Sequence, residues 1–205
     1  MNKAIAIIAG EPNSISSEII FKSWKLRKKI IQKPLIIIGS IKLLKLQKKK
    51  LKHSIKIKEI KNNFDVNKFD KDALQVLNVE FTQKKAFQKI SIKSNKYIFK
   101  CFNIAISLTK NKKIVGFINC PISKEKLFQN QYQGITEFIS KKYRSKGNEV
   151  MLIFNKKLSV SPLTTHIPLK KVSKKINKFE IVKKVKIINN FYKKIFNKNP
   201  NIAVL

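Results

Sequence analysis

The segment from Gly116 to Phe138 reads GFINCPISKEKLFQNQYQGITEF and combines a strand end with the beginnings of two helical patterns. An apolar run from Ile114 to Ile118 predicts a buried strand, which ends at Cys120-Pro121. One helical pattern begins at Ser123, and the turn Gly134–Glu137 opens another. Ligands of α/β proteins bind beyond such strand ends. We therefore expect a functional site in this segment.

The first part of the chain alternates short apolar runs with helical patterns. Runs at Ala4–Ala9 and Leu35–Ile38 predict buried strands, and turn residues that begin with glycine end each of them. A helix capped by Ser14 or Ser16 follows the first run, and a helix over residues 41–51 follows the second. This order predicts an α/β fold with a parallel-rich sheet and helices on both of its faces.

The middle of the chain gives weaker signals. Residues 55–58 alternate between apolar and lysine, as an edge strand does, and the polar stretch 62–77 predicts a loop. An alternative interpretation is that residues 53–100 form a mobile insertion without a fixed partner. A helical pattern returns over Tyr97–Thr109 and leads into the strand at Ile114.

The last part of the chain predicts two neighbouring strands at 149–154 and 158–163. A long amphipathic helix is expected over Phe179–Phe196, with an apolar stripe and lysines elsewhere. The four apolar residues Ile202–Leu205 predict the start of a further strand.

The composition is strongly basic, with 46 lysines and arginines against 11 acidic residues and a formal net charge of +35. Such a surface attracts polyanions without regard to their sequence. Specific phosphate and base recognition usually uses arginine, and only Arg27 and Arg144 are present. Because the lysines are spread over every segment, we interpret the charge as compositional bias. A basic nucleic-acid-binding protein is an alternative that rests on charge alone.

Cysteine usage and hydropathy indicate a compartment. Cys101 and Cys120 are too few for a disulfide framework or a cysteine-based metal site, so a reducing cytoplasm is expected. The N-terminal apolar run has no cleavage-site pattern, and no stretch approaches the roughly 20 apolar residues of a membrane helix. The sequence therefore predicts a cytoplasmic protein with no membrane partner.

Four short motifs occur in a fixed order along the chain. Residues 10–18 read GEPNSISSE, residues 119–125 read NCPISKE, residues 134–137 read GITE and residues 164–169 read TTHIPL. They resemble the motifs GDPAGIGPE, TxPIxKE, GHTE and TTHxPL of the 4-hydroxythreonine-4-phosphate dehydrogenases, NAD-dependent enzymes of vitamin B6 synthesis. The resemblance covers essentially the whole chain and implies membership of that family.

The resemblance also implies site residues. Thr136 and Lys124 would contact a small phosphorylated amino-acid substrate, and His166 would be one of three histidine ligands of a divalent metal. Ile135 stands where the family has a histidine that contacts the substrate. Catalytic and NAD-binding residues are not assigned by the motifs. The implied architecture resembles isocitrate and isopropylmalate dehydrogenases, in which the active site lies between domains of a homodimer.

The implied reaction is the oxidation and decarboxylation of 4-phosphooxy-L-threonine. The chain has only two histidines, and His53 lies in a lysine-rich segment where we expect a surface residue. The family's other metal ligands and most of its cofactor-binding segments lie beyond the point that matches Leu205. We therefore expect residues 1–205 to be an N-terminal portion without its C-terminal portion, impaired or inactive alone, and completed by a homodimer partner or a complementing C-terminal fragment. A non-catalytic remnant or one half of a split enzyme is the alternative.

Overall fold

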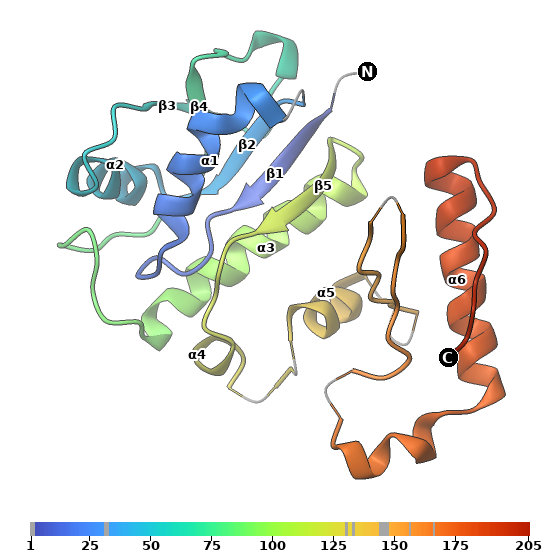
Figure 1. Cartoon of the computed structure of the whole chain (residues 1–205). Coiled ribbons are helices and arrows are strands. Elements are labelled where there is room, and N and C mark those ends of the chain that lie inside the picture. Colours follow the sequence, from blue (N-terminus) through green and yellow to red (C-terminus); the bar gives the residue numbers. More distant parts are fainter. Residues whose placement is uncertain are drawn as a thin grey trace. The chain divides into compact units, whose positions relative to one another are not determined.

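The computed structural model describes residues 3–30, 33–129, 131–132, 134–143, 148–155, 157–165 and 167–205. They belong to two compact units, residues 1–131 and residues 132–205, and Figure 1 labels their helices and strands. The first unit contains the sheet that the sequence predicts. The second unit consists mainly of helices and irregular segments.

The first unit is built on a five-stranded sheet in which every neighbouring pair is parallel, in the order β3-β4-β2-β1-β5. Its strands are β1 (Ala4–Ile8), β2 (Leu35–Gly39), β3 (Lys56–Ile60), β4 (Ala73–Asn78) and β5 (Ile114–Asn119). Ile7 pairs with Ile37 of β2 on one side and with Ile118 of β5 on the other. The predicted α/β fold with a parallel sheet is confirmed.

Four helices accompany this sheet, and they begin close to the predicted positions. They are α1 (Ser16–Ile30), α2 (Ile41–Lys50), α3 (Asn95–Lys110) and α4 (Lys124–Phe128). The Ser40 side chain caps α2 by accepting a hydrogen bond from Leu43 N. The helix predicted from Ser123 is a short one of 5 residues.

Strand β1 shows how the two faces of the sheet are covered. Ile5 and Ile7 pack against a buried apolar cluster to which α1 and α2 contribute, including Phe21. Successive residues of a strand point to opposite faces, so Ala4 and Ala6 point to the face that α3 covers, and both are fully buried. Their small side chains let α3 approach the sheet closely. Helices therefore lie on both faces, as predicted (Figure 1).

Strand β4 (Ala73–Asn78) occupies the last five residues of the segment 62–77 that the sequence predicts as a loop, so that prediction is wrong for this part. Its apolar run is interrupted by Gln75, which is buried and donates to the carbonyl oxygens of Asp70 and Ala73 at 2.7 and 2.9 Å. The mobile-insertion alternative for residues 53–100 is also wrong, because this segment supplies two strands of the sheet. The predicted edge strand is confirmed as β3.

The second unit contains α5 (Ile135–Tyr143) and the long helix α6 (Lys178–Phe196). The two strands predicted at 149–154 and 158–163 reduce to one antiparallel bridge between Ile153 and Val160. Residues 201–205 are exposed and form no strand in the described structure, so the strand predicted at Ile202–Leu205 is wrong. Four apolar residues form a strand only where a neighbouring strand can pair with them.

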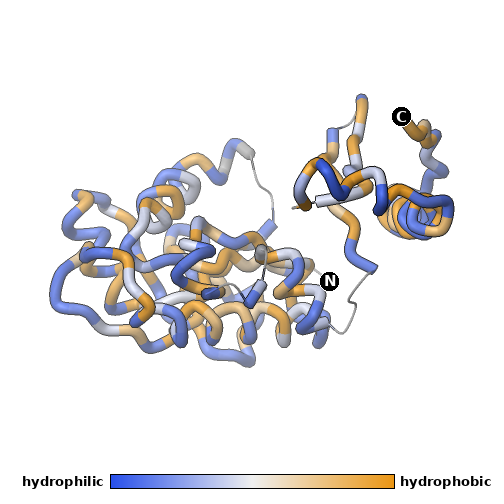
Figure 2. The backbone as a smooth tube through the Cα atoms, turned by 90° about the horizontal axis from the view of Figure 1, so that it is seen from below, coloured by the Kyte–Doolittle hydropathy of each residue, from blue (hydrophilic) through white to orange (hydrophobic). Residues whose placement is uncertain are grey.

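Helix α6 packs one side against the segment around this bridge. The Phe196 ring stacks on Phe154 at 5.1 Å, and Tyr192 Oη hydrogen-bonds with Ser159 Oγ at 2.9 Å. None of the described residues of α6 is buried. Hydrophilic and hydrophobic residues alternate along the chain in both units (Figure 2). In the part of the chain that the structure describes, every helix is too short or too polar to cross a membrane.

The two cysteines are buried in the first unit, and burial raises their pKa values. The pKa of the Cys101 thiol is raised to about 12 and that of Cys120 to about 11. In the unfolded chain both thiols return to a pKa of about 8.5. Below the pKa of the unfolded chain, the protonated thiols therefore contribute their full share of the free energy of unfolding. This share is lost as the pH rises from that pKa through the higher pKa values of the folded protein.

We predict that Cys101→Ala weakens the dependence of stability on alkaline pH. Between the unfolded and the folded pKa, a thiol that is protonated only in the folded state lowers the free energy of unfolding by about 1.4 kcal/mol for each pH unit of increase. The difference in free energy of unfolding between the parent and Cys101→Ala should narrow by that amount between pH 9 and pH 10, measured by urea denaturation. Cys120→Ala should behave similarly and level off sooner. A difference that does not change with pH would contradict this prediction.

Candidate functional site

The carboxyl ends of β1, β2 and β5 lie at one edge of the sheet, and each strand continues into a loop that leads to a helix. Backbone hydrogen bonds extend the sheet slightly beyond the strands: Ala9 N donates to Ile38 O and Cys120 N donates to Ile8 O, each at 3.0 Å. The loops that follow β1 and β5 are therefore side by side. They carry the first two of the four motifs.

Gly10 is the point at which these two loops come closest. Its φ angle is +73°, a conformation that side-chain-bearing residues rarely adopt. A Cβ atom at this position would lie 2.5 Å from Pro121 O and 3.0 Å from the Cys120 carbonyl carbon. The first residue of the GEP sequence must therefore be glycine for the two loops to meet.

The Pro121 carbonyl oxygen joins the two motifs through two hydrogen bonds. Glu11 N donates to it at 2.9 Å, and Ser16 Oγ donates to it at 3.2 Å. Ser16 and Pro121 are 105 residues apart in the sequence. Ser14 Oγ supports the same loop by donating to Glu11 O at 2.8 Å. Two motifs from distant parts of the chain thus form one structure.

The Glu11 side chain is 2% exposed and accepts two hydrogen bonds. Ser94 Oγ donates to Oε2 at 2.9 Å, and Asn13 N donates to Oε1 at 3.3 Å. Such partners are required when a carboxylate is buried. Because Ser94 immediately precedes α3, the Glu11 carboxylate connects the loop after β1 to the start of that helix.

The end of β2 is held by Tyr97 of α3. Ser40 N donates to the Tyr97 hydroxyl oxygen at 3.1 Å. Burial, with a smaller contribution from the nearby Cys101 thiol, raises the pKa of Tyr97 well above its usual value, so the hydroxyl stays neutral. Gly39 leaves the required space, because a Cβ atom there would lie 2.7 Å from Ala9 Cβ and 3.1 Å from the Tyr97 hydroxyl.

The space enclosed by these loops is too small for a substrate. A cavity of about 10 Å³ lies between Glu11, Ser17, Ser40 and Tyr97, which is room for about one water molecule. Ser17 Oγ is buried and has no hydrogen-bond partner within the described residues. The interior of the junction is therefore packed, and a larger ligand would bind on the outer surface of the loops.

Lys124, a predicted substrate contact, lies on that outer surface. It is the exposed first residue of α4, directly after the loop that contains Pro121. Its neighbour Lys126 is paired with Glu125 at 3.2 Å, whereas Lys124 has no ion pair in the described part of the chain. An ammonium group in this position is available to a phosphate. Contact with a substrate stays a prediction.

Thr136, the other predicted substrate contact, belongs to the second unit. It is exposed in the first turn of α5, next to the half-buried Ile135. Glu137 Oε2 is buried without a hydrogen-bond partner among the described residues. Lys124 and Thr136 lie in different units, each described by itself, so a joint site stays a prediction.

His166, the predicted metal ligand, lies outside the described residues. Within the residues that are described, no three histidine, cysteine, aspartate or glutamate side chains gather in a way that could hold a metal ion. These residues do not form a metal site of their own. His53, predicted to lie at the surface, is half-buried: its ring lies 5.3 Å from that of Phe21, and its side chain lines a pocket. It packs there because it follows α2 closely and turns back over α1.

Three residues that organise the site carry no recognisable signal in the sequence. Ser94 and Tyr97 lie at the start of a helix whose pattern indicates only an apolar face. Gln47 lies on the apolar side of α2, and its Nε2 donates to the carbonyl oxygens of Pro12 and Ala86 at 2.6 and 3.0 Å. Of the three, only Gln47 stands out in the sequence, as a polar residue on an otherwise apolar helix face.

Comparison with known proteins identifies similar sequences. The family model described as pyridoxal phosphate biosynthetic protein PdxA matches residues 31–205. The 4-hydroxythreonine-4-phosphate dehydrogenase of Sulfurihydrogenibium sp. is 34% identical to the chain over 205 residues, which is 98% of the chain. The D-threonate 4-phosphate dehydrogenase of Salmonella typhimurium is 26% identical over 207 residues, again 98% of the chain.

A solved structure agrees in fold. A 4-hydroxythreonine-4-phosphate dehydrogenase from Burkholderia phymatum superposes with a TM-score of 0.79 and is 20% identical in sequence. The match covers 93% of the chain and 58% of the solved protein. The chain likewise spans 62% of the length of both curated relatives.

We predict that Gly10→Ala destabilises the first unit. The strained backbone and the collision with Pro121 O should together lower the free energy of unfolding by at least about 2 kcal/mol, measured by urea denaturation. Gly116→Ala is the matched control, because a Cβ atom at Gly116 meets nothing within 4 Å. Equal effects of the two substitutions would show that the contact between the loops does not limit stability.

Proposed function

Because the chain belongs to the PdxA family of pyridoxal phosphate biosynthetic proteins, we propose that it is the N-terminal portion of an NAD-dependent dehydrogenase acting on 4-phosphooxy-L-threonine. The family match over residues 31–205 carries this proposal. The meeting of the GEP and CPI motifs at the Pro121 carbonyl supports it, since ligands of parallel α/β sheets bind at this edge.

In the proposed reaction, NAD would accept a hydride from the carbon that carries the substrate hydroxyl, the hydroxyl would release its proton, and the resulting β-keto acid would lose CO₂. Lys124 would bind the substrate phosphate as a point charge, which is how lysine recognises phosphate. The Thr136 hydroxyl would donate a hydrogen bond to the same substrate. Ile135 cannot hydrogen-bond, so this chain would bind the phosphate with one polar group fewer than the family pattern supplies.

The phosphate is also the substrate feature that the named relatives share. One acts on 4-hydroxythreonine 4-phosphate and the other on D-threonate 4-phosphate, according to their names. A phosphorylated hydroxy acid is therefore the substrate class that we propose. Its favoured member is 4-phosphooxy-L-threonine, the compound also called 4-hydroxythreonine 4-phosphate, because the relative with the higher identity is named after it.

His166 is the residue of this chain that we propose as a metal ligand. The described residues gather no metal site, so we propose that the remaining ligands lie outside them, in the portion of the relatives that residues 1–205 do not match. We propose a complementing C-terminal portion in a homodimeric, cytoplasmic assembly. A non-catalytic remnant remains the alternative, and complementation separates the two. The nucleic-acid alternative receives no support from the family match.

We predict that the chain alone forms no NADH from the phosphorylated substrate, NAD and a divalent metal. Addition of the C-terminal portion of the Sulfurihydrogenibium relative should produce NADH, and Ile135→His should increase the rate by restoring a charge-assisted hydrogen bond to the phosphate. Absorbance of NADH measures both effects, and the added fragment alone is the control.

Substantial turnover by the chain alone would show that its active site lies elsewhere than proposed. Failure of Ile135→His to increase the rate of the complemented enzyme would show that GITE does not correspond to GHTE. Failure of complementation with a folded mixture would favour the non-catalytic remnant.

We predict that Lys124→Gln raises the KM of the complemented enzyme for its phosphorylated substrate by about tenfold or more, since a hydrogen bond to a charged group contributes about 1.5–3 kcal/mol. Lys126→Gln is the matched control from the same helix. It should change KM by less than about twofold, because it removes only an exposed ion pair. Equal effects of the two substitutions would remove Lys124 from the site.

A further inference from the structure

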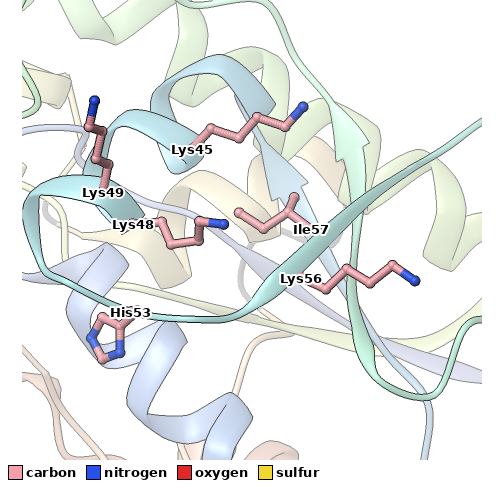
Figure 3. A pocket seen from close by; sticks show the side chains of 6 residues that line it. All are labelled: Lys45, Lys48, Lys49, His53, Lys56 and Ile57. Carbon is pink, nitrogen blue, oxygen red and sulfur yellow. The ribbon is translucent and has the colours of Figure 1, made fainter.

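A basic pocket lies between α2 and β3, away from the loops that hold the motifs. It has a volume of about 630 Å³ and is lined by Lys45, Lys48, Lys49, His53, Lys56 and Ile57. The first three residues come from α2, His53 comes from the connection, and the last two come from β3 (Figure 3). Among the residues that the structure describes, no acidic side chain lines it.

The pocket and the candidate active site lie at opposite ends of the strands of the sheet. The pocket is formed by the C-terminal half of α2 and by Lys56 and Ile57 at the beginning of β3. Gly10 and Pro121, by contrast, follow the carboxyl ends of their strands. In a parallel sheet these are opposite ends of the strands, so the pocket is separate from the candidate active site.

The charges in this pocket are poorly compensated. Lys56 is paired with Asp70 at 2.8 Å. Among the described residues, the ammonium groups of Lys45, Lys48 and Lys49 have no ion-pair partner. Lys48 and Lys49 follow Lys45 by three and four residues, a spacing at which like charges on a helix destabilise each other. An anion with several charges would relieve this repulsion.

His53 adds a second observation. Its Nδ1 atom is buried and has no hydrogen-bond partner in the described structure, although the side chain lines the pocket. Ile57 adds an apolar side chain to the lining, at some distance from His53 (Figure 3). Four residues of helix rise about 6 Å, so the lysine charges are spread over a longer distance than one phosphoryl group occupies. The pocket therefore suits a chain of phosphoryl groups better than a single phosphate.

We propose that this pocket binds a small anion that carries two or more linked phosphoryl groups, either a nucleoside triphosphate or free polyphosphate. The three α2 lysines contact the phosphoryl groups as point charges. Ile57 is the apolar part of the lining against which a nucleoside would rest. Lysines in the last turn of a helix also complement its dipole, and this simpler role predicts an effect on stability without an effect on binding.

The test is isothermal titration calorimetry of the full chain with tripolyphosphate, ATP and inorganic phosphate at about 150 mM KCl, where non-specific attraction is strongly screened. The pocket variant is Lys45→Gln/Lys48→Gln/Lys49→Gln. The matched control is Lys93→Gln/Lys96→Gln/Lys100→Gln, which removes three exposed lysines at and near the start of α3. A third variant, Lys45→Arg/Lys48→Arg/Lys49→Arg, keeps the charges.

We expect the pocket variant to bind tripolyphosphate or ATP about tenfold more weakly or worse, and the α3 variant to lose less than about threefold. The arginine variant should retain binding. Equal affinity for tripolyphosphate and ATP would show that linked phosphoryl groups alone are sufficient for binding, whereas tighter binding of ATP would identify a nucleotide site. Thermal unfolding by circular dichroism and the single substitution Lys48→Gln establish that loss of binding is not loss of folding.

Three outcomes would overturn the proposal. Equal losses in the pocket and α3 variants would show attraction by net charge alone. Inorganic phosphate that binds as tightly as tripolyphosphate would exclude a site for linked phosphoryl groups. An oligonucleotide that loses affinity only in the pocket variant, while neither small ligand binds, would make the pocket a nucleic-acid contact instead.

Discussion

Two hydrogen bonds to the Pro121 carbonyl oxygen hold together the loops after β1 and β5. They form only because Gly10 has no side chain to separate the two loops. The same loop directs Glu11 inward to Ser94, which fixes the beginning of α3. The position of one helix and the ends of two strands thus depend on one backbone oxygen. Substrate contacts proposed on the surface of these loops depend on it in turn.

The parts of the fold that the sequence predicts correctly are those in which local pattern and tertiary environment agree. β1 and β2 are continuous apolar runs because both faces of the sheet are covered. β4 is equally buried, yet Gln75 interrupts its run and donates to backbone carbonyl oxygens just before it, those of Asp70 and Ala73. Only the folded structure shows that this polar residue is satisfied. At Ile202–Leu205 the error is the opposite one: the apolar pattern predicts a strand that the structure does not contain. A strand also needs a neighbouring strand to pair with, and the pattern does not show whether one is present.

The candidate site is predicted to a similar, limited extent. The sequence places the motifs at strand ends, and the structure shows that two of them meet there. The sequence does not indicate that Ser94 and Tyr97 hold the loops, because both residues lie at the start of a helix that is distant from the loops in the sequence. Roles for Lys124 and Thr136 rest on family resemblance. No local property distinguishes Lys124 from the many other exposed lysines.

Gly10 and Gly39 also bear on how the chain tolerates its unusual composition. Lysine can accumulate on an exposed surface at little structural expense, and the first unit retains an ordinary buried core beneath it. The chain has only 5 glycines, and these two stand where an added methyl group would collide with backbone or with packed side chains. Ala4 and Ala6 are confined in the same way beneath α3. Steric exclusion at a few small residues therefore marks positions that a lysine, or any larger side chain, cannot occupy without loss of the fold.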